Sequence, residues 1–174
     1  LPAGFSYDFD IMLNDWREAT LHCLTLGATS ITAHVDLYSD EDITTLVSMV
    51  APRNAALGIA VSNDKSIDFH AEMIRNAHAL YPKVFIQVMG IKKIGEQGQF
   101  FDEETPERVR LLKQQFGSMS VHVDGGMTPD SAKLVHMAGA DTIVAGSYLF
   151  SHAEAAEAYG KLASEFTDKQ YLNN

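Results

Sequence analysis

Strand-like and helix-like segments alternate along this sequence, and each predicted strand is followed closely by the start of a helix. The clearest case is residues 120–150, SVHVDGGMTPDSAKLVHMAGADTIVAGSYLF, which predict a strand, a helix and a second strand. Thr128, Pro129 and Asp130 are typical of a helix start, and Gly139 is typical of a helix end. Strict alternation with apolar strands favours a parallel sheet covered by helices.

The same unit recurs about six times along the chain. Strands are expected near 7–13, 30–35, 57–61, 84–89, 120–123 and 142–145. The segments 27–33 and 139–145 share the frame G-A-x-x-I-x-A, which supports a repeated architecture. A complete barrel of eight units normally needs at least ~200 residues. At 174 residues, the chain is predicted to be an α/β, TIM-barrel-type parallel βα repeat truncated to about six βα units, forming an open or partly open barrel.

Composition limits the number of domains, the partners and the compartment. With 46% hydrophobic content, residues 1–174 are predicted to form one domain with a sizeable core. The net charge of -10 argues against a nucleic acid or an anionic membrane as partner, because both are themselves negatively charged. The single cysteine, Cys23, excludes an internal disulfide and predicts a reducing, cytoplasmic compartment.

Two glycine-rich turns follow the last two predicted strands. Asp124 stands at the end of one strand, directly before Gly125 and Gly126, and the other strand runs into Gly146 and Ser147. Small residues allow close approach, and helix amino termini carry partial positive charge, so two such turns side by side can hold an anion. The pattern indicates a phosphate site with a carboxylate beside it. The alternative is that these glycines only make tight βα turns.

Several motifs together resemble the ribulose-phosphate 3-epimerase family over essentially the whole chain. They are VDGG with a following proline, AGADTIVAGS, and the segment 95–101, GEQGQFF, which resembles the family loop G-F-G-G-Q-x-F. Residues 31–36, ITAHVD, resemble the family strand I-T-F-H-V-E, and residues 10–14 correspond to its D-x-H-L-M strand. On this alignment the chain corresponds to family strands three to eight, and the first two βα units are missing.

The resemblance implies a substrate, a mechanism and a set of roles. Members of that family fold as TIM barrels and interconvert D-ribulose 5-phosphate and D-xylulose 5-phosphate in the pentose phosphate pathway. Two aspartates exchange the C3 proton from opposite faces, while a divalent metal (Zn, Mn, Fe or Co) stabilises the enediolate. By resemblance, Asp124 is a catalytic carboxylate and a metal ligand. The sugar phosphate is expected to bind Gly95, Gly98, Gln99, Gly125, Gly126, Gly146 and Ser147.

The chain also departs from the family pattern. The opposing aspartate and one metal-binding histidine belong to the second family strand, which has no counterpart here. Another histidine position is occupied by Met12, and a thioether is a poor ligand for such metals. The metal site is therefore expected to be weak or absent. His34 and Asp36 are expected on one face of their strand and could replace lost catalytic groups; the alternative is that they only fill the barrel interior.

Three functions remain open from the sequence. The first is an epimerase acting on a small phosphorylated sugar through a rebuilt or shared site. The second is a phosphosugar-binding protein that has lost turnover. The third is a decarboxylase or synthase of the same superfamily, although the D-x-K-x-x-D strand motif of that class is missing.

An open barrel leaves its first and last strands without a partner. Here these strands are the predicted segments 7–13 and 142–145. Unpaired edges of buried-type strands favour pairing with, or coverage by, another chain. The sequence therefore predicts a homo-oligomer that covers these edges; the alternative is that the sequence is an excerpt of a longer protein.

Overall fold

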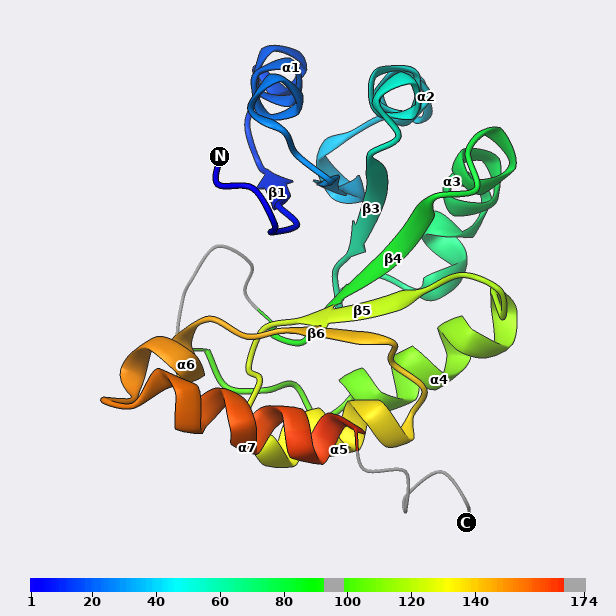
Figure 1. Ribbon diagram of the computed structural model, residues 1–174. Helices are drawn as coiled ribbons and strands as arrows, with labels where there is room; N and C mark the ends of the chain where they lie inside the picture. The colour runs from blue at the N-terminus through cyan, green and yellow to red at the C-terminus, as the bar shows by residue number, and fades with distance from the viewer. Residues whose placement is uncertain (93–98, 168–174) are drawn as a thin grey trace. The chain divides into compact units, whose positions relative to one another are not determined.

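The computed structural model describes residues 1–92 and 99–167 (Figure 1). Its strands are β1 (Asp8–Ile11), β2 (Ser30–His34), β3 (Ala56–Val61), β4 (Val84–Met89), β5 (Val121–Asp124) and β6 (Thr142–Val144). Its α-helices are α1 (Trp16–Leu26), α2 (Asp40–Val50), α3 (Ile67–Leu80), α4 (Thr105–Gln115), α5 (Pro129–Met137), α6 (Ser147–Ser151) and α7 (Ala155–Thr167). Two 3-10 turns, η1 (Val35–Leu37) and η2 (Ala51–Arg53), complete the described elements.

The strands form one sheet in chain order, β1-β2-β3-β4-β5-β6. The pairs β1–β2, β2–β3 and β5–β6 are parallel, as expected when a helix connects successive strands. The order begins with β1 and ends with β6, so it has two edge strands. This topology confirms the predicted TIM-barrel-type βα repeat of six units. Helix α6 is an addition to the predicted elements.

By its contacts the chain divides into two compact units, and each is described by itself. Unit 1 contains residues 1–61 and 66–87, and unit 2 contains residues 62–65 and the chain from residue 88 onward. The sequence-based expectation of a single domain stays a prediction. Within the described residues, we find no helix with the length and apolar character needed to cross a membrane.

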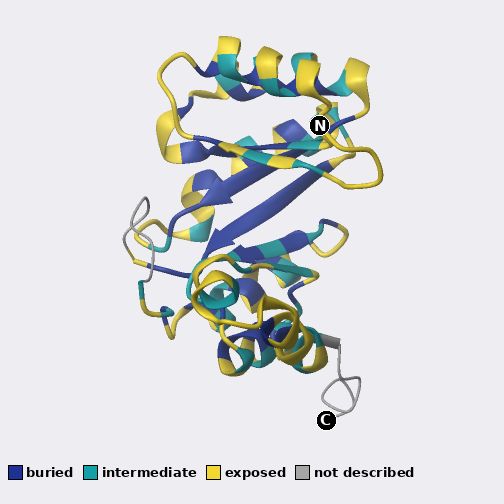
Figure 2. Ribbon diagram, turned by 60° about the vertical axis from the view of Figure 1, so that its left-hand side comes forward, coloured by how far each residue is buried: buried dark blue, intermediate teal, exposed yellow. Residues whose placement is uncertain are grey.

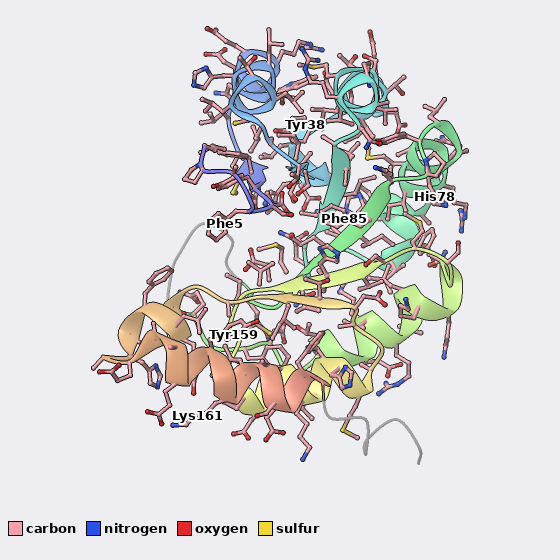
Figure 3. All side chains as sticks on the ribbon, in the orientation of Figure 1. Phe5, Tyr38, His78, Phe85, Tyr159 and Lys161 are labelled. Atoms are coloured by element: carbon pink, nitrogen blue, oxygen red, sulfur yellow. The ribbon has the colours of Figure 1, made fainter. Side chains whose placement is uncertain are left out.

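The core of unit 1 lies between its strands and helices α1 to α3. Strand β3 is almost entirely buried (Figure 2), and Leu57 and Ile59 are fully so. The ring of Phe85 (Figure 3) covers Gly58, where an added Cβ would lie 2.5 Å from the ring. Tyr38 donates a hydrogen bond from its hydroxyl to the Ile11 carbonyl at 2.8 Å. The Tyr38 hydrogen bond ties the end of β1 to the segment that follows η1.

The core of unit 2 lies between β5 and helices α4, α5 and α7. Val121 and Val123 of β5 are fully buried, and so are Val109 of α4 and Val135 of α5. Helix α7 packs on α5 and α6, and β5 and β6 run side by side (Figure 1). This packing fixes the carboxyl ends of β5 and β6 relative to each other, which is where the sequence analysis expected a binding site.

Candidate functional site

Asp124 is the last residue of β5, and the strand holds it at the tip. Burial alternates along β5, so that Val121 and Val123 face the core, while His122 and Asp124 share the other, half-buried face. The carbonyl of Asp124 accepts a hydrogen bond from the backbone N–H of Gly90 at 2.7 Å. Asp124 is therefore presented at the strand end, as the sequence predicted.

The turn after β5 requires glycine for backbone conformation and packing. Gly125 has φ 108° and Gly126 has φ 66°, both in the left-handed region that glycine tolerates best. A Cβ on Gly126 would lie 2.6 Å from the Cα of Phe101, and a Cβ on Gly90 would collide with the carbonyl oxygen of Gly125. Packing of neighbouring backbone therefore accounts for these glycines independently of any ligand. The alternative of structural βα turns is supported at these positions.

Side chains at the start of helix α5 accept hydrogen bonds from backbone N–H groups there. The Thr128 hydroxyl accepts from the Ser131 N–H at 3.3 Å, and the Ser131 hydroxyl accepts from the Thr128 N–H at 2.8 Å. Pro129 has no N–H, and Asp130 adds negative charge in the first turn. This capping box leaves little free hydrogen-bonding capacity for an anion at α5.

The turn after β6 is open by comparison. Helix α6 starts after Gly146 and has no side-chain cap, so its first N–H groups lack an acceptor within the helix. Gly146 and Ser147 are exposed, and an added Cβ on Gly146 would meet no heavy atom within 4 Å. This exposure leaves room for an anion beside the start of α6. In TIM barrels, a short extra helix after the last strand commonly contributes to a phosphate site.

A cavity of about 790 Å³ connects the two turns within unit 2. It is lined by Gln99, Phe100, Phe101, Glu103, Gly126, Met127, Thr128, Asp130, Ser131, Leu134, Ser147, Tyr148 and Ser151. Three predicted phosphate-binding residues, Gln99, Gly126 and Ser147, are thus brought together. The charged members of this lining, Glu103 and Asp130, are both acidic, so a phosphate here would depend on N–H and hydroxyl donors.

Other predicted site residues lie elsewhere. Gly95 and Gly98 lie outside the described residues. His34 and Met12 belong to unit 1, where His34 is buried and Met12 is exposed. Nε2 of His34 lies 2.9 Å from Oδ1 and 3.0 Å from Oδ2 of Asp10. Asp10 was missed as a partner of His34 by sequence reasoning, although strand periodicity and the predicted parallel sheet were signals that the two could face each other.

The family resemblance implies a divalent metal with Asp124 among its ligands. No group of three or more His, Cys, Asp and Glu side chains among residues 1–92 and 99–167 could hold a metal ion. The imidazole of His34 already contacts the Asp10 carboxylate, and Met12 offers only a thioether. Asp124 alone is an incomplete ligand set for such an ion.

The family model and the curated relatives that match this chain belong to the same family. A model of the ribulose-phosphate 3 epimerase family matches residues 3–150. A cytoplasmic isoform of ribulose-phosphate 3-epimerase from Oryza sativa subsp. japonica is 28% identical over 144 residues, covering 83% of this chain and 61% of that protein. Ribulose-phosphate 3-epimerase from Chlamydia trachomatis is 32% identical over 130 residues, covering 71% and 52%. The chain thus spans about half to three fifths of the length of these relatives.

Solved structures show the same fold at lower identity. KGPDC from Streptococcus mutans has a TM-score of 0.71 at 16% identity, with 94% of this chain and 72% of that chain covered. The 3-keto-L-gulonate-6-phosphate decarboxylase from Vibrio cholerae has a TM-score of 0.68 at 15% identity, with 91% and 71% covered. These likenesses confirm the fold class.

Proposed function

Because the chain belongs to the ribulose-phosphate 3-epimerase family, we propose that it interconverts D-ribulose 5-phosphate and D-xylulose 5-phosphate through the C3 proton. The observation that carries the proposal is the pairing of β5 with β6. Its register sets Asp124 opposite Val144, so the carboxylate-bearing strand end lies next to the turn at Gly146 and Ser147. A carboxylate beside an open anion-binding turn is what removal of a proton from a sugar phosphate requires.

In this proposal the phosphate is bound chiefly by the turn after β6. Its support is the uncapped start of α6, the exposure of Gly146 and Ser147, and the cavity that Ser147 shares with Gly126. Gly125 and Gln99 are proposed as further contacts. Gly95 and Gly98 keep the phosphate-binding role expected from the family loop, as a prediction.

Asp124 is proposed as the base that takes the C3 proton. Its carboxylate would accept the proton as the enediolate forms and return it in the reverse direction. Epimerisation also needs a proton donor for the opposite face of C3, since one carboxylate serves one face. The catalytic role that the sequence suggested for His34 stays a prediction; within unit 1 its imidazole contacts the Asp10 carboxylate.

The compartment and the oligomeric state are further parts of the proposal. The rice relative is named a cytoplasmic isoform, and we extend this compartment to the chain as part of the proposal. A homo-oligomer is also part of the proposal, supported by the two edge strands of the sheet order. A phosphosugar-binding protein without turnover is the second candidate; the sequence feature behind it is Met12, which stands where the family has a histidine, and the family match does not favour it.

Exchange of the C3 hydrogen with solvent tests the proposal. The full chain is incubated with D-ribulose 5-phosphate in deuterated water, with and without added divalent metal, and loss of the C3 proton signal is followed by NMR. We expect exchange, and we expect Asp124→Asn to slow it by about 10²–10⁴-fold, the usual contribution of a general base. Phosphate affinity should remain, because the N–H donors of the turns are unchanged.

The matched control is Asp141→Asn. Asp141 lies immediately before β6, at the opposite end of the same strand pair, where it accepts hydrogen bonds from the Val121 N–H and from Lys113. This variant should exchange C3 at the wild-type rate. Binding of the sugar phosphate without any exchange would favour the second candidate, and exchange that survives Asp124→Asn would remove Asp124 from the mechanism.

A further inference from the structure

Asp102 is a buried carboxylate on the segment between β4 and α4. Its side chain is only 4% exposed. A carboxylate removed from water costs several kcal/mol unless partners replace the lost hydration, so a buried one is retained only within a network that satisfies it. No motif in the sequence gives this residue a role.

The partners of Asp102 come from the turn after β3 and from the start of α4. Nδ2 of Asn63 donates to Oδ2 of Asp102 at 3.1 Å and to Oγ1 of Thr105 at 3.2 Å. The backbone N–H of Glu104 donates to Oδ1 of Asp102 at 3.3 Å, and Lys92 Nζ lies 3.8 Å from the same oxygen. Both amide hydrogens of Asn63 are used, which fixes the orientation of its side chain.

Arg108 holds the same turn from the other side. Its Nη2 donates to the carbonyl of Asn63 at 2.9 Å and also to the carbonyl of Lys65. The turn of residues 62–65 is therefore tied to α4 through both the Asn63 side chain and its own backbone. Two independent attachments leave the turn little freedom to shift against α4.

The backbone of Asp102 continues this connection to the candidate site. Its N–H donates to the Gly90 carbonyl at 2.8 Å, and the Gly90 N–H donates to the Asp124 carbonyl at 2.7 Å. The preceding residue, Phe101, provides the backbone that lies against Gly126. Asp102 thus connects the segments that follow β3, β4 and β5.

We propose that Asp102 is a positioning residue for the phosphate-binding turns. Its buried carboxylate sets the position of Phe101 against Gly126 and of Gly90 beneath Asp124, and so sets the cavity wall that Gly126 and Ser147 share. An apolar residue of similar size would pack equally well but would hold neither Asn63 nor the Glu104 N–H. The effect on ligand binding rests on the proposed function; the effect on the turn geometry does not.

The test compares Asp102→Ala with Asp141→Ala in the full chain. Asp141 is the control because it also binds a backbone N–H and a lysine within unit 2, but at the amino end of β6. Two readouts are needed: the backbone amide NMR signals of Gly90 and Gly126, and the dissociation constant of inorganic phosphate. Thermal unfolding of each variant identifies a temperature at which all are folded.

Asp102→Ala should move the Gly90 and Gly126 amide signals and weaken phosphate binding by about tenfold, the effect of losing one or two hydrogen bonds in a network. Asp141→Ala should lower stability and change neither readout. Asp102→Asn keeps one carbonyl oxygen for Asn63 and should show a smaller change in the same direction. If Asp102→Ala fails to fold, Asp102→Asn tests the positioning role in its place.

Wild-type amide signals at Gly90 and Gly126 in both Asp102 variants would overturn the proposal. An equal effect of Asp141→Ala would also overturn it, because the role would then be general stability. If the amide signals move but the wild-type protein binds no phosphate, the positioning role stands and the proposed phosphate site is wrong.

Discussion

Gly126 and Gly146 follow neighbouring strands, yet the protein atoms around them differ. Gly126 has a positive φ and lies against the backbone of Phe101, so any side chain there is excluded by protein atoms. Gly146 has a negative φ of -109° and open space around the position of a Cβ. Packing explains the first glycine, while no described protein contact requires the second.

Substitution by alanine tests this difference. We expect Gly126→Ala to lower the free energy of unfolding by about 2–4 kcal/mol, from backbone overpacking and a strained left-handed residue. Gly146→Ala should change it by less than about 0.5 kcal/mol, because no contact is created. Urea denaturation of both variants measures the difference. Equal stabilities would contradict the close approach of Phe101 to Gly126.

The sequence predicted the placement of single residues where they belong to a local motif. Asp124 and the glycines beside it were identifiable because a strand end and a helix start bracket them. The partner of His34 could not be identified from the sequence, because its contact with Asp10 depends on the register of two strands. The Asp102–Asn63 hydrogen bond joins residues 39 positions apart, and no periodicity in the sequence connects them. Side-chain networks between loops depend on tertiary structure.

Most strands and helices were predictable from hydrophobic periodicity and from the residues that start and end helices. The expected strand 84–89 and helix 67–80 match β4 and α3. Helix α6 was missed, because five residues are too few to show a helical period. The capping box of α5 was visible only in part, since the Thr128 signal could be read but the return contact from Ser131 could not.

Strand β5 carries a titratable group on its site-facing side. Burial lowers the pKa of the His122 imidazole, and the charge of Asp141 partly opposes this. Because the pKa is lower in the folded state, the unfolded chain takes up the proton first as pH falls. The free energy of unfolding should therefore be insensitive to His122 above pH about 6.5 and should decrease below it.

His122→Gln should reduce this loss of stability between pH 7 and pH 5. Urea denaturation at several pH values measures it in both proteins. In NMR titration, the His122 ring signal should have a lower midpoint in the folded protein than in the urea-unfolded chain. A midpoint that is higher in the folded protein would show that a negative charge, and not burial, dominates at this position.

At the scale of the whole molecule, the net charge of -10 opposes the approach of a phosphate ester. The lining of the unit 2 cavity adds Glu103 and Asp130 and, among the described residues, no basic side chain. A bound phosphate would therefore depend on N–H and hydroxyl donors of the cavity lining, which must outweigh the repulsion from the net charge. The predicted homo-oligomer stays a prediction at this scale.

On the proposed function, the turns after β5 and β6 form a phosphate site beside Asp124. Titration of the isotopically labelled chain with inorganic phosphate, followed by backbone amide NMR, measures binding at these turns. We expect saturable shifts of the Gly126 and Ser147 amide signals, with the Gly27 signal in unit 1 unchanged. Shifts that do not saturate, or that appear equally at Gly27, would contradict it.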